Sequence, residues 1–523
     1  MHWSRWGDPD QAESLPEPIV QLLHKTLGVR SPAPAVAMEA VELPEPSLSA
    51  SASEALVAAV GADHVFTDAE SRIRHTRGKS TLDLLRIRRG DASDAPDTVV
   101  QPASHDEVVQ VLEACASHRV AVVPFGGGTS VVGGLAPASY GGFIAMDLRR
   151  MDRLVELDAE SRLATLEPGL LAPRAEELLR ERGFTLGHFP QSFEWASIGG
   201  FAATRSSGQA SAGYGRFDEM VVRMRVATPA GTLRLGRAPR SAAGPDLRQL
   251  VLGSEGAFGV ITSITVQVQP APDASVYEGW QFPTFGAGMA AMRRLAQDGP
   301  LPTVLRLSDE AETAIGLTDP EHVGSADSQS GCLLIAGYEG PTAAVAGQRD
   351  GVAAVLRDAG GEPLGDEPGE RWAAGRYAAP YLRDALLDVG AFAETLETAT
   401  FWSNVPRLYA AVRDALTSSL AGQGAPPLVL CHVSHVYPAG ASLYFTVICA
   451  QGADPVGQWQ RTKSAASEVM TAAGGTISHH HGVGTDHRDW LIGEIGPLGV
   501  EVLRAIKDRL DPARILNPGV LIP

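Results

Sequence analysis

From residue 95 onward, short runs of apolar, β-branched residues alternate with stretches whose apolar positions recur at helical spacing. A brief apolar strand at 98–100 is followed by Ser104 and, three residues later, Glu107, the pattern of a capped helix start. An amphipathic helix comes next, and a second β-branched strand then runs into the glycines that begin at Gly126. The pattern predicts a strand–helix–strand unit at the start of an α+β domain.

Further strands are expected up to residue 273. Strand-like runs lie at 141–148, 154–169, 219–236 and 256–270. The third run alternates apolar and polar residues around a Pro-Ala-Gly turn, which is typical of a β-hairpin. We therefore predict one domain over residues 95–273.

The pattern changes at about residue 274. Helical spacing marks 286–299 and 340–361, and strand-like runs recur at 332–340, 427–438 and 441–450. Strands interleaved with helices predict a second domain, 274–470, with an antiparallel sheet covered by helices. Residues 471–523 are expected to form a C-terminal segment that carries a helix.

The first 94 residues have weaker patterning. Apolar residues follow helical spacing at 17–29, whereas 31–53 is rich in Pro, Ala and Ser. We therefore expect a short helix and an extended linker before the first domain.

Charge and cysteine content exclude several classes of function. The 523 residues carry a formal net charge of -18 and a pI near 5.2, which opposes binding to nucleic acid phosphates. The 4 cysteines form no CxxC pair, so neither a disulfide scaffold nor a zinc ribbon is indicated. No signal-peptide pattern and no apolar run of about 20 residues is found. We expect a cytoplasmic protein, with peripheral contact to the inner face of the membrane and a homodimer as further hypotheses.

A glycine-rich stretch, "PFGGGTSVVGG" at 124–134, follows a predicted strand. Glycines let backbone N–H groups converge on a phosphate, although a purely structural turn explains the same letters. The stretch is neither a Walker loop nor a GxGxxG fingerprint. Three further segments, at 191–220, 253–262 and 515–519, are rich in small residues or end in Asn-Pro-Gly.

The order of these segments resembles a known family. "QPASHDEV", "PFGGGTS", "SIGGFAATRSSG", "GSEGAFGVIT" and "LNPG" together resemble the vanillyl-alcohol-oxidase (PCMH-type) FAD-binding flavoproteins. Within them, "RWGD", "YLRD", "SHVY", "AGASLYF" and "SHHHGVG" resemble the alkyldihydroxyacetonephosphate synthases, flavoenzymes of ether lipid synthesis. The resemblance implies a two-subdomain FAD-binding domain followed by a cap domain, and a C-terminal segment that returns to the FAD domain.

The resemblance also implies which residues hold FAD. These are Pro124, Phe125, Gly126, Gly127, Gly128, Thr129, Ser130, Gln191, Ser192, Ser197, Thr204, Arg205, Ser206, Ser207, Ser254, Glu255, Gly256, Gly259, Val260 and Ile261. Non-covalent FAD is expected, because the 124–130 loop has no His or Cys of the kind that links the flavin in some relatives. Gln191 replaces the acid of the family at the start of the second loop, which puts one polar contact to the cofactor in doubt.

Three consecutive histidines, His479, His480 and His481, are open to three interpretations: metal ligands, acid–base groups or a solvated loop. Read as a strand, His479 and His481 share one face and His480 lies on the other, so at most two reach one metal ion. An imidazole titrates near pH 6.5 and can move protons at cellular pH. The resemblance makes all three catalytic, with His481 facing the flavin and the other two supporting it or binding a phosphate.

Three more residues are candidates for the same site. Tyr444 lies in an alternating strand, where the alternative is a half-buried sheet tyrosine; the resemblance makes it the acid–base group at the substrate carbon. A phenol has a pKa of about 10 and needs a nearby imidazolium or arginine to act as a base. Arg383 is implied to clamp an anion, against pairing with Asp384 within its helix. His435 is a further substrate-binding candidate.

Two functions follow from the resemblance. The first is an FAD-dependent transferase that exchanges the acyl chain of acyl-dihydroxyacetone phosphate for a long-chain alcohol, without net redox change and without a metal. The second is an FAD-dependent 2-hydroxy acid dehydrogenase, whose relatives carry a metal. Here Tyr444 and His480 stand where those relatives have a histidine and a glutamate, and both departures oppose the metal. A non-catalytic binding protein is a third class, disfavoured by the retained tyrosine and histidines.

Overall fold

The computed structural model describes residues 1–30, 32–137, 142–315 and 331–523. The first residue of the predicted linker, at position 31, lies outside these ranges. The short helix expected at 17–29 is confirmed as α1 (Glu17–Leu27), and it is followed along the chain by α2 (Ala50–Val60), α3 (Ala69–Arg74) and α4 (Thr81–Ile87). The prediction of an extended linker up to residue 53 is therefore wrong at its end, because Ser49 caps α2 through a hydrogen bond to the Ala52 N–H.

The first sheet has four strands in the order β1–β2–β4–β3. They are β1 (Val65–Phe66), β2 (Thr98–Val100), β4 (Phe143–Asp147) and β3 (Ala121–Phe125), and the last three run parallel. The predicted capped helix is confirmed as α5 (His105–His118), since the Ser104 hydroxyl accepts the Glu107 N–H. Because β3 runs directly into residues 126–130, this sheet positions the start of the glycine loop.

The second sheet is antiparallel, in the order β5–β6–β10–β8–β9. Its strands are β5 (Leu154–Asp158), β6 (Leu163–Leu166), β10 (Val260–Gln267), β8 (Val221–Thr228) and β9 (Gly231–Leu235). The predicted hairpin at 219–236 is confirmed as β8–β9. The helices between residues 172 and 251 are α6 (Ala172–Arg180), α7 (Ile198–Thr204), α8 (Ser211–Tyr214), α9 (Phe217–Met220) and α10 (Arg248–Val251), and the short strands β7 (Phe184–Thr185) and β11 (Gln269–Pro270) pair with each other.

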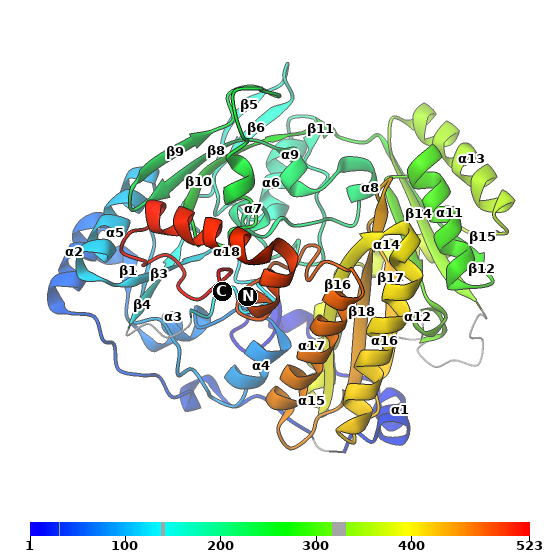
Figure 1. The fold of residues 1–523 in the computed structure, drawn as a ribbon, viewed down its shortest axis with the longest axis horizontal. Coiled ribbons are helices and arrows are strands. Elements are labelled where there is room, and N and C mark those ends of the chain that lie inside the picture. Colours follow the sequence, from blue (N-terminus) through cyan, green and yellow to red (C-terminus); the bar gives the residue numbers. More distant parts are fainter. Residues whose placement is uncertain (31, 138–141, 316–330) are drawn as a thin grey trace.

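A seven-stranded antiparallel sheet begins with β12 and forms the other half of the molecule (Figure 1). Its order is β15 (Glu362–Gly365), β12 (Ala274–Phe282), β14 (Cys332–Gly340), β13 (Val304–Ser308), β17 (Leu428–Val433), β18 (Gly440–Ala450) and β16 (Ala391–Phe401). Helices of this half are α11 (Phe285–Asp298), α12 (Glu310–Ile315), α13 (Thr342–Asp358), α14 (Glu367–Gly375), α15 (Ala379–Asp388), α16 (Val405–Gly422) and α17 (Pro455–Ala472). The predicted antiparallel sheet covered by helices is confirmed.

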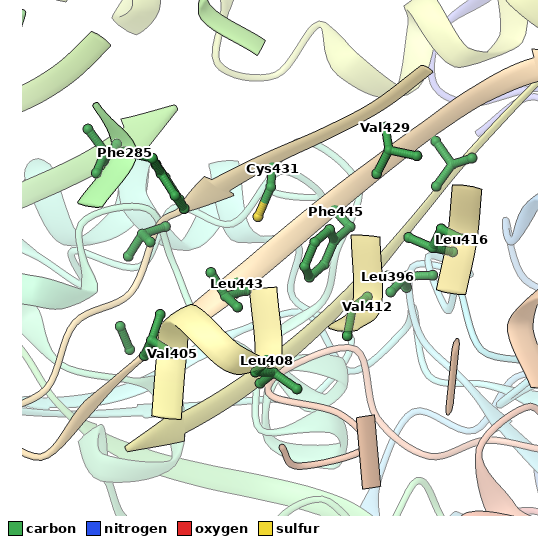
Figure 2. Packing of buried hydrophobic residues seen from close by; sticks show 14 of the residues in the cluster. Phe285, Leu396, Val405, Leu408, Val412, Leu416, Val429, Cys431, Leu443 and Phe445 are labelled. Atoms are coloured by element: carbon green, nitrogen blue, oxygen red, sulfur yellow. The ribbon is translucent and has the colours of Figure 1, made fainter. Parts of the chain in front are cut away.

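The core of this half forms where α16 covers the sheet. Leu408, Val412 and Leu416 recur at helical spacing and are buried against Leu443 and Phe445 of β18 (Figure 2). The opposite face of β18 is therefore free to line a cavity, because successive strand residues point to opposite faces.

The C-terminal segment returns to the first half. After α17, residues 475–487 form a loop, and α18 (Leu491–Leu510) then leads to a tail in which Leu516 bridges Val122 of β3. The prediction of a strand at the three histidines is therefore wrong. Among the helices of the described ranges, none has the length and apolarity to cross a membrane.

Candidate active site

A cavity of about 390 Å³ lies between the glycine loop and the seven-stranded sheet. Most predicted cofactor residues line it, namely Pro124 to Ser130, Gln191, Ser192, Ser197, Thr204, Ser206, Ser207, Glu255, Gly256, Gly259 and Ile261. So do Tyr444, His480, His481, Arg383 and His435. The structure thus brings residues from six distant segments to one space.

Four predicted site residues do not line the cavity. The Arg205 guanidinium donates hydrogen bonds to the carbonyls of Leu252 and Gln249. Val260, the first residue of β10, packs in a hydrophobic cluster. Ser254 is buried beside the lining, and His479 lies behind His480.

The glycine loop owes its shape to close backbone contacts. A Cβ on Gly127 would lie 1.8 Å from the Trp195 carbonyl oxygen, and one on Gly126 would lie 2.2 Å from the Ser197 hydroxyl. Only glycines allow the loop to pack against residues 195–197, which places both loops along one side of the cavity. The backbone N–H groups of these glycines are not shielded by side chains. Together with the hydroxyls of Thr129 and Ser130, they suit the pyrophosphate of a dinucleotide such as FAD.

The C-terminal segment also contacts residues that line the cavity. Glu255 accepts hydrogen bonds from the N–H groups of Val483 and Gly484, and burial raises its pKa to about 7. The Asn517 amide donates to the carbonyls of Gly134 (2.9 Å) and Glu255 (2.6 Å). Residues near positions 130, 255, 484 and 517 are thereby joined in one network.

The histidine loop is folded around one carboxylate. Glu397 of β16, 2% exposed, accepts the backbone N–H groups of His479, His480 and His481 at 2.6, 3.0 and 2.9 Å, and the Ser478 hydroxyl at 2.9 Å. Although burial opposes ionisation, the pKa of Glu397 lies well below its usual range, because the backbone N–H groups and the side chains of the three histidines all face its carboxylate. Three N–H groups that converge on one anion require a turn, which is why these residues cannot form a strand.

This turn lets three imidazoles meet. Ligand atoms of His435, His479 and His480 lie within 4.8 Å of one another, a spacing that a metal ion could bridge. The expectation that adjacent histidines must diverge is therefore wrong. Protein groups already occupy several of these nitrogens, however. Tyr437 Oη and Arg216 Nη1 lie 2.6 and 3.0 Å from His479 Nε2, and Ser211 Oγ lies 2.8 Å from His435 Nδ1.

The imidazoles are held neutral. Burial lowers the pKa of His481 to about 3, and burial with neighbouring imidazoles lowers the pKa of His435 and His479 well below 6.5. The cluster therefore contains proton acceptors. The imidazole of His481 beside Tyr444 is therefore neutral, because burial disfavours the charged form of a histidine.

Tyr444 lies on the cavity face of β18, opposite Glu397 in the register with β16. Its ring stacks on His432 at 4.8 Å and meets the His481 ring at 5.7 Å. Burial raises the pKa of the phenol to about 12, so it stays protonated, and its hydroxyl lies 3.4 Å from Gln191 Oε1. The glutamine that departs from the family pattern thus faces the predicted catalytic tyrosine.

Arg383 of α15 pairs with Asp384 and also lines the cavity. Its guanidinium contacts Asp384 at 3.2 Å and donates to the Lys79 carbonyl at 2.6 Å, and it also lines the cavity. A guanidinium fixed by two protein acceptors retains further N–H donors for an anion.

Sequence reasoning missed several lining residues. Arg306 lines the cavity and contacts Glu312 at 2.5 Å and His432 at 3.1 Å. The ring of His432 in turn stacks on the ring of Tyr444. The alternation of His432 and Ser434 in a predicted strand was a usable signal for His432, because residues two apart share a face. Trp6 also lines the cavity, and no local pattern connects it to residues 375 or more positions away.

Comparison with known proteins agrees with this arrangement. Residues 96–236 match the model of the FAD binding domain, and residues 271–521 match that of the FAD linked oxidases, C-terminal domain. An alkyldihydroxyacetonephosphate synthase from Dictyostelium discoideum is 35% identical, over 88% of this chain and 79% of its own. A mitochondrial D-lactate dehydrogenase [cytochrome] from Arabidopsis thaliana is 31% identical, over 88% of this chain and 78% of its own.

A solved structure of an alkyldihydroxyacetonephosphate synthase superposes with a TM-score of 0.83 at 30% identity and covers 99% of this chain and 98% of its own. The matched domains and the glycine-lined cavity establish FAD as the cofactor. Its non-covalent attachment stays a prediction. The chain belongs to the alkyldihydroxyacetonephosphate synthase family of FAD-linked oxidases.

Proposed function

We propose that the protein exchanges the acyl chain of an acyl-dihydroxyacetone phosphate for a long-chain alcohol. One observation carries the proposal: Tyr444, His480, His481 and Arg383 line the same cavity as the glycine loop. The relatives with this name are also more similar to the chain than the lactate dehydrogenase is. In the net reaction the ester C–O bond of the substrate breaks, an ether C–O bond forms, and a fatty acid leaves with the proton of the alcohol.

Bound FAD would supply an electron-accepting ring held by the loops at 124–130 and 191–207. Arg383 would bind the substrate phosphate, because its planar donors match phosphate oxygens. The neutral imidazoles at His480 and His481 would accept protons from the substrate and the alcohol. Tyr444, which stays protonated, would donate a hydrogen bond or a proton to a substrate oxygen. This assignment makes a histidine, rather than the tyrosine, the proton acceptor.

A 2-hydroxy acid dehydrogenase is the second candidate, favoured by the convergence of His435, His479 and His480. The Arg216 guanidinium opposes it, since a cation 3.0 Å from His479 Nε2 repels a divalent metal ion. Tyr444 also leaves the site one ligand short of the set in such relatives.

The test is incubation of the FAD-loaded protein with palmitoyl-dihydroxyacetone phosphate and hexadecanol, under anaerobic conditions and without an electron acceptor. We expect equal amounts of hexadecyl-dihydroxyacetone phosphate and palmitate, with the flavin oxidised at the end. Bleaching of the flavin by D-lactate, with no ether product from the lipid substrates, would instead establish the dehydrogenase.

We also propose a cytoplasmic protein that contacts the inner face of the membrane peripherally, and a homodimer. Exposed apolar side chains on α18, including Leu498 at 72% exposure, support contact with a lipid surface. Binding to phospholipid vesicles that is lost in Leu498→Ser would test the membrane contact.

A further inference from the structure

The first eight residues run along the helix that carries Arg383, and we call them the strap (residues 1–8). Arg5 pairs with Asp388 at 2.8 Å, the Trp6 N–H donates to Asp384 Oδ2 at 2.5 Å, and the Asp8 N–H donates to the Tyr381 hydroxyl at 3.3 Å. The partners at 388, 384 and 381 are successive turns of α15, so the strap follows one side of this helix.

Lys79 fixes the strap on its other side. Its ammonium donates to the carbonyls of His2 (2.7 Å) and Trp3 (2.9 Å), while its own carbonyl accepts the Arg383 guanidinium. Asp384 links the strap directly to Arg383. Its Oδ2 accepts a hydrogen bond from the Trp6 N–H, and its Oδ1 accepts one from the Arg383 Nε–H. Arg383 is thus held by residues that the strap also binds.

The side chain of Trp6 belongs to the cavity. Trp6 is 3% exposed and lines the same space as Arg383, Leu382 and Leu386. Its indole N–H is buried without a hydrogen-bond partner among the described residues. A buried donor costs free energy unless a ligand satisfies it, and the neighbouring guanidinium selects for an anionic ligand.

We propose that Trp6 is a specificity-determining residue of the substrate subsite, where it lies beside Arg383 and contacts the part of an alkyl phosphate next to its anionic group. The strap is then a positioning element for Arg383. This inference rests on the proposed function for the class of ligand, and on the geometry of the strap for the residues.

The strap contains a matched control. Trp3 is also buried, at 8% exposure, but packs in the hydrophobic core and does not line the cavity. The experiment compares Trp6→Phe with Trp3→Phe in the FAD-loaded protein and titrates both with dodecyl phosphate, followed by the flavin absorbance. Trp6→Phe should weaken binding about tenfold, whereas Trp3→Phe should stay within about twofold of the unmodified protein.

Equal losses in the two variants would overturn the proposal, and so would unchanged binding in Trp6→Phe or no binding of dodecyl phosphate to the unmodified protein. If Trp6→Phe does not retain FAD, Asp384→Asn replaces it, since this variant keeps the side-chain volume and weakens the link to Arg383. Weaker binding with FAD retained supports the proposal, and unchanged binding contradicts it. Binding that depends on Trp6, in a protein that forms no ether product, would refute only the proposed function.

Discussion

Single residues decide the geometry of the histidine loop, and Glu397 is the clearest case. In Glu397→Gln, one oxygen and an amide NH₂ replace a carboxylate that accepts three N–H groups and a hydroxyl. We expect turnover to fall by about 10²-fold, because His480 and His481 lose their positions. Steady-state kinetics with a measured FAD content checks this.

The control for that variant is Glu278→Gln, another buried carboxylate, which binds Trp280, Tyr338 and Arg349 and does not line the cavity. Both variants should lose stability, by about 3 kcal/mol each, but only Glu397→Gln should lose turnover. Similar turnover in the two variants would mean that Glu397 has a structural role only.

Replacing Tyr444 by phenylalanine tests the role of its hydroxyl with little change in the shape of the side chain. Tyr444→Phe removes the hydroxyl and keeps the ring that stacks on His432. Turnover should fall by about 10²-fold or more while the flavin spectrum and FAD content stay the same. Unchanged turnover would identify Tyr444 as an ordinary sheet residue.

The three imidazoles of His435, His479 and His480 predict a result with a chelator. Because Arg216 lies beside His479, we expect dialysis against EDTA to leave the synthase activity unchanged. Loss of activity that zinc or manganese restores would show that the cluster holds a metal, and would favour the dehydrogenase.

Among the elements, the loop at 126–130 depends on the absence of side chains. Gly127→Ala should reduce the FAD content strongly, because its Cβ would lie 1.8 Å from a backbone oxygen and would separate the two loops. Gly347→Ala is the matched control. Gly347 is exposed within α13 with no atom near its Cβ, so this change should stabilise the protein by about 1 kcal/mol without affecting FAD. Flavin absorbance after gel filtration distinguishes the two.

The elements also show what the sequence could predict. The β8–β9 hairpin and the capped helix α5 were predictable, because their signals lie within 20 residues: alternation around a turn, and Ser104 with Glu107. The shape of the histidine loop was not, because it is imposed by Glu397, more than 80 residues earlier in the chain. Which residues meet at the cavity was predictable only through family resemblance, and the motif "RWGD" that contains Trp6 gave no indication of its contact with Asp384, 378 residues away.

For the whole molecule, buried neutral imidazoles predict how stability depends on pH. Burial lowers the pKa of His188 and of His481 to about 3, whereas an exposed histidine titrates near 6.5. Between these values the unfolded chain binds more protons, so stability is full above pH 6.5 and declines as pH falls toward 3. Each such histidine contributes up to about 1.4 kcal/mol per pH unit.

Urea unfolding between pH 7.5 and 5 measures this slope. His481→Gln should flatten it by the share of one histidine, since glutamine binds no proton in either state. A slope that is the same in the variant would show that His481 is protonated in the folded protein.

The bond from Asn517 to the carbonyls of Gly134 and Glu255 has a consequence for biosynthesis. Gly134 and Glu255, at the two sides of the cofactor cavity, are synthesised 383 and 262 residues before Asn517, whose side chain joins them. A nascent chain that has not yet emitted residues 511–517 lacks the Leu516 bridge to β3 as well. We therefore expect FAD to be acquired only after residue 517 has left the ribosome, so that messages truncated before codon 511 yield colourless protein even when residues 95–470 have been made.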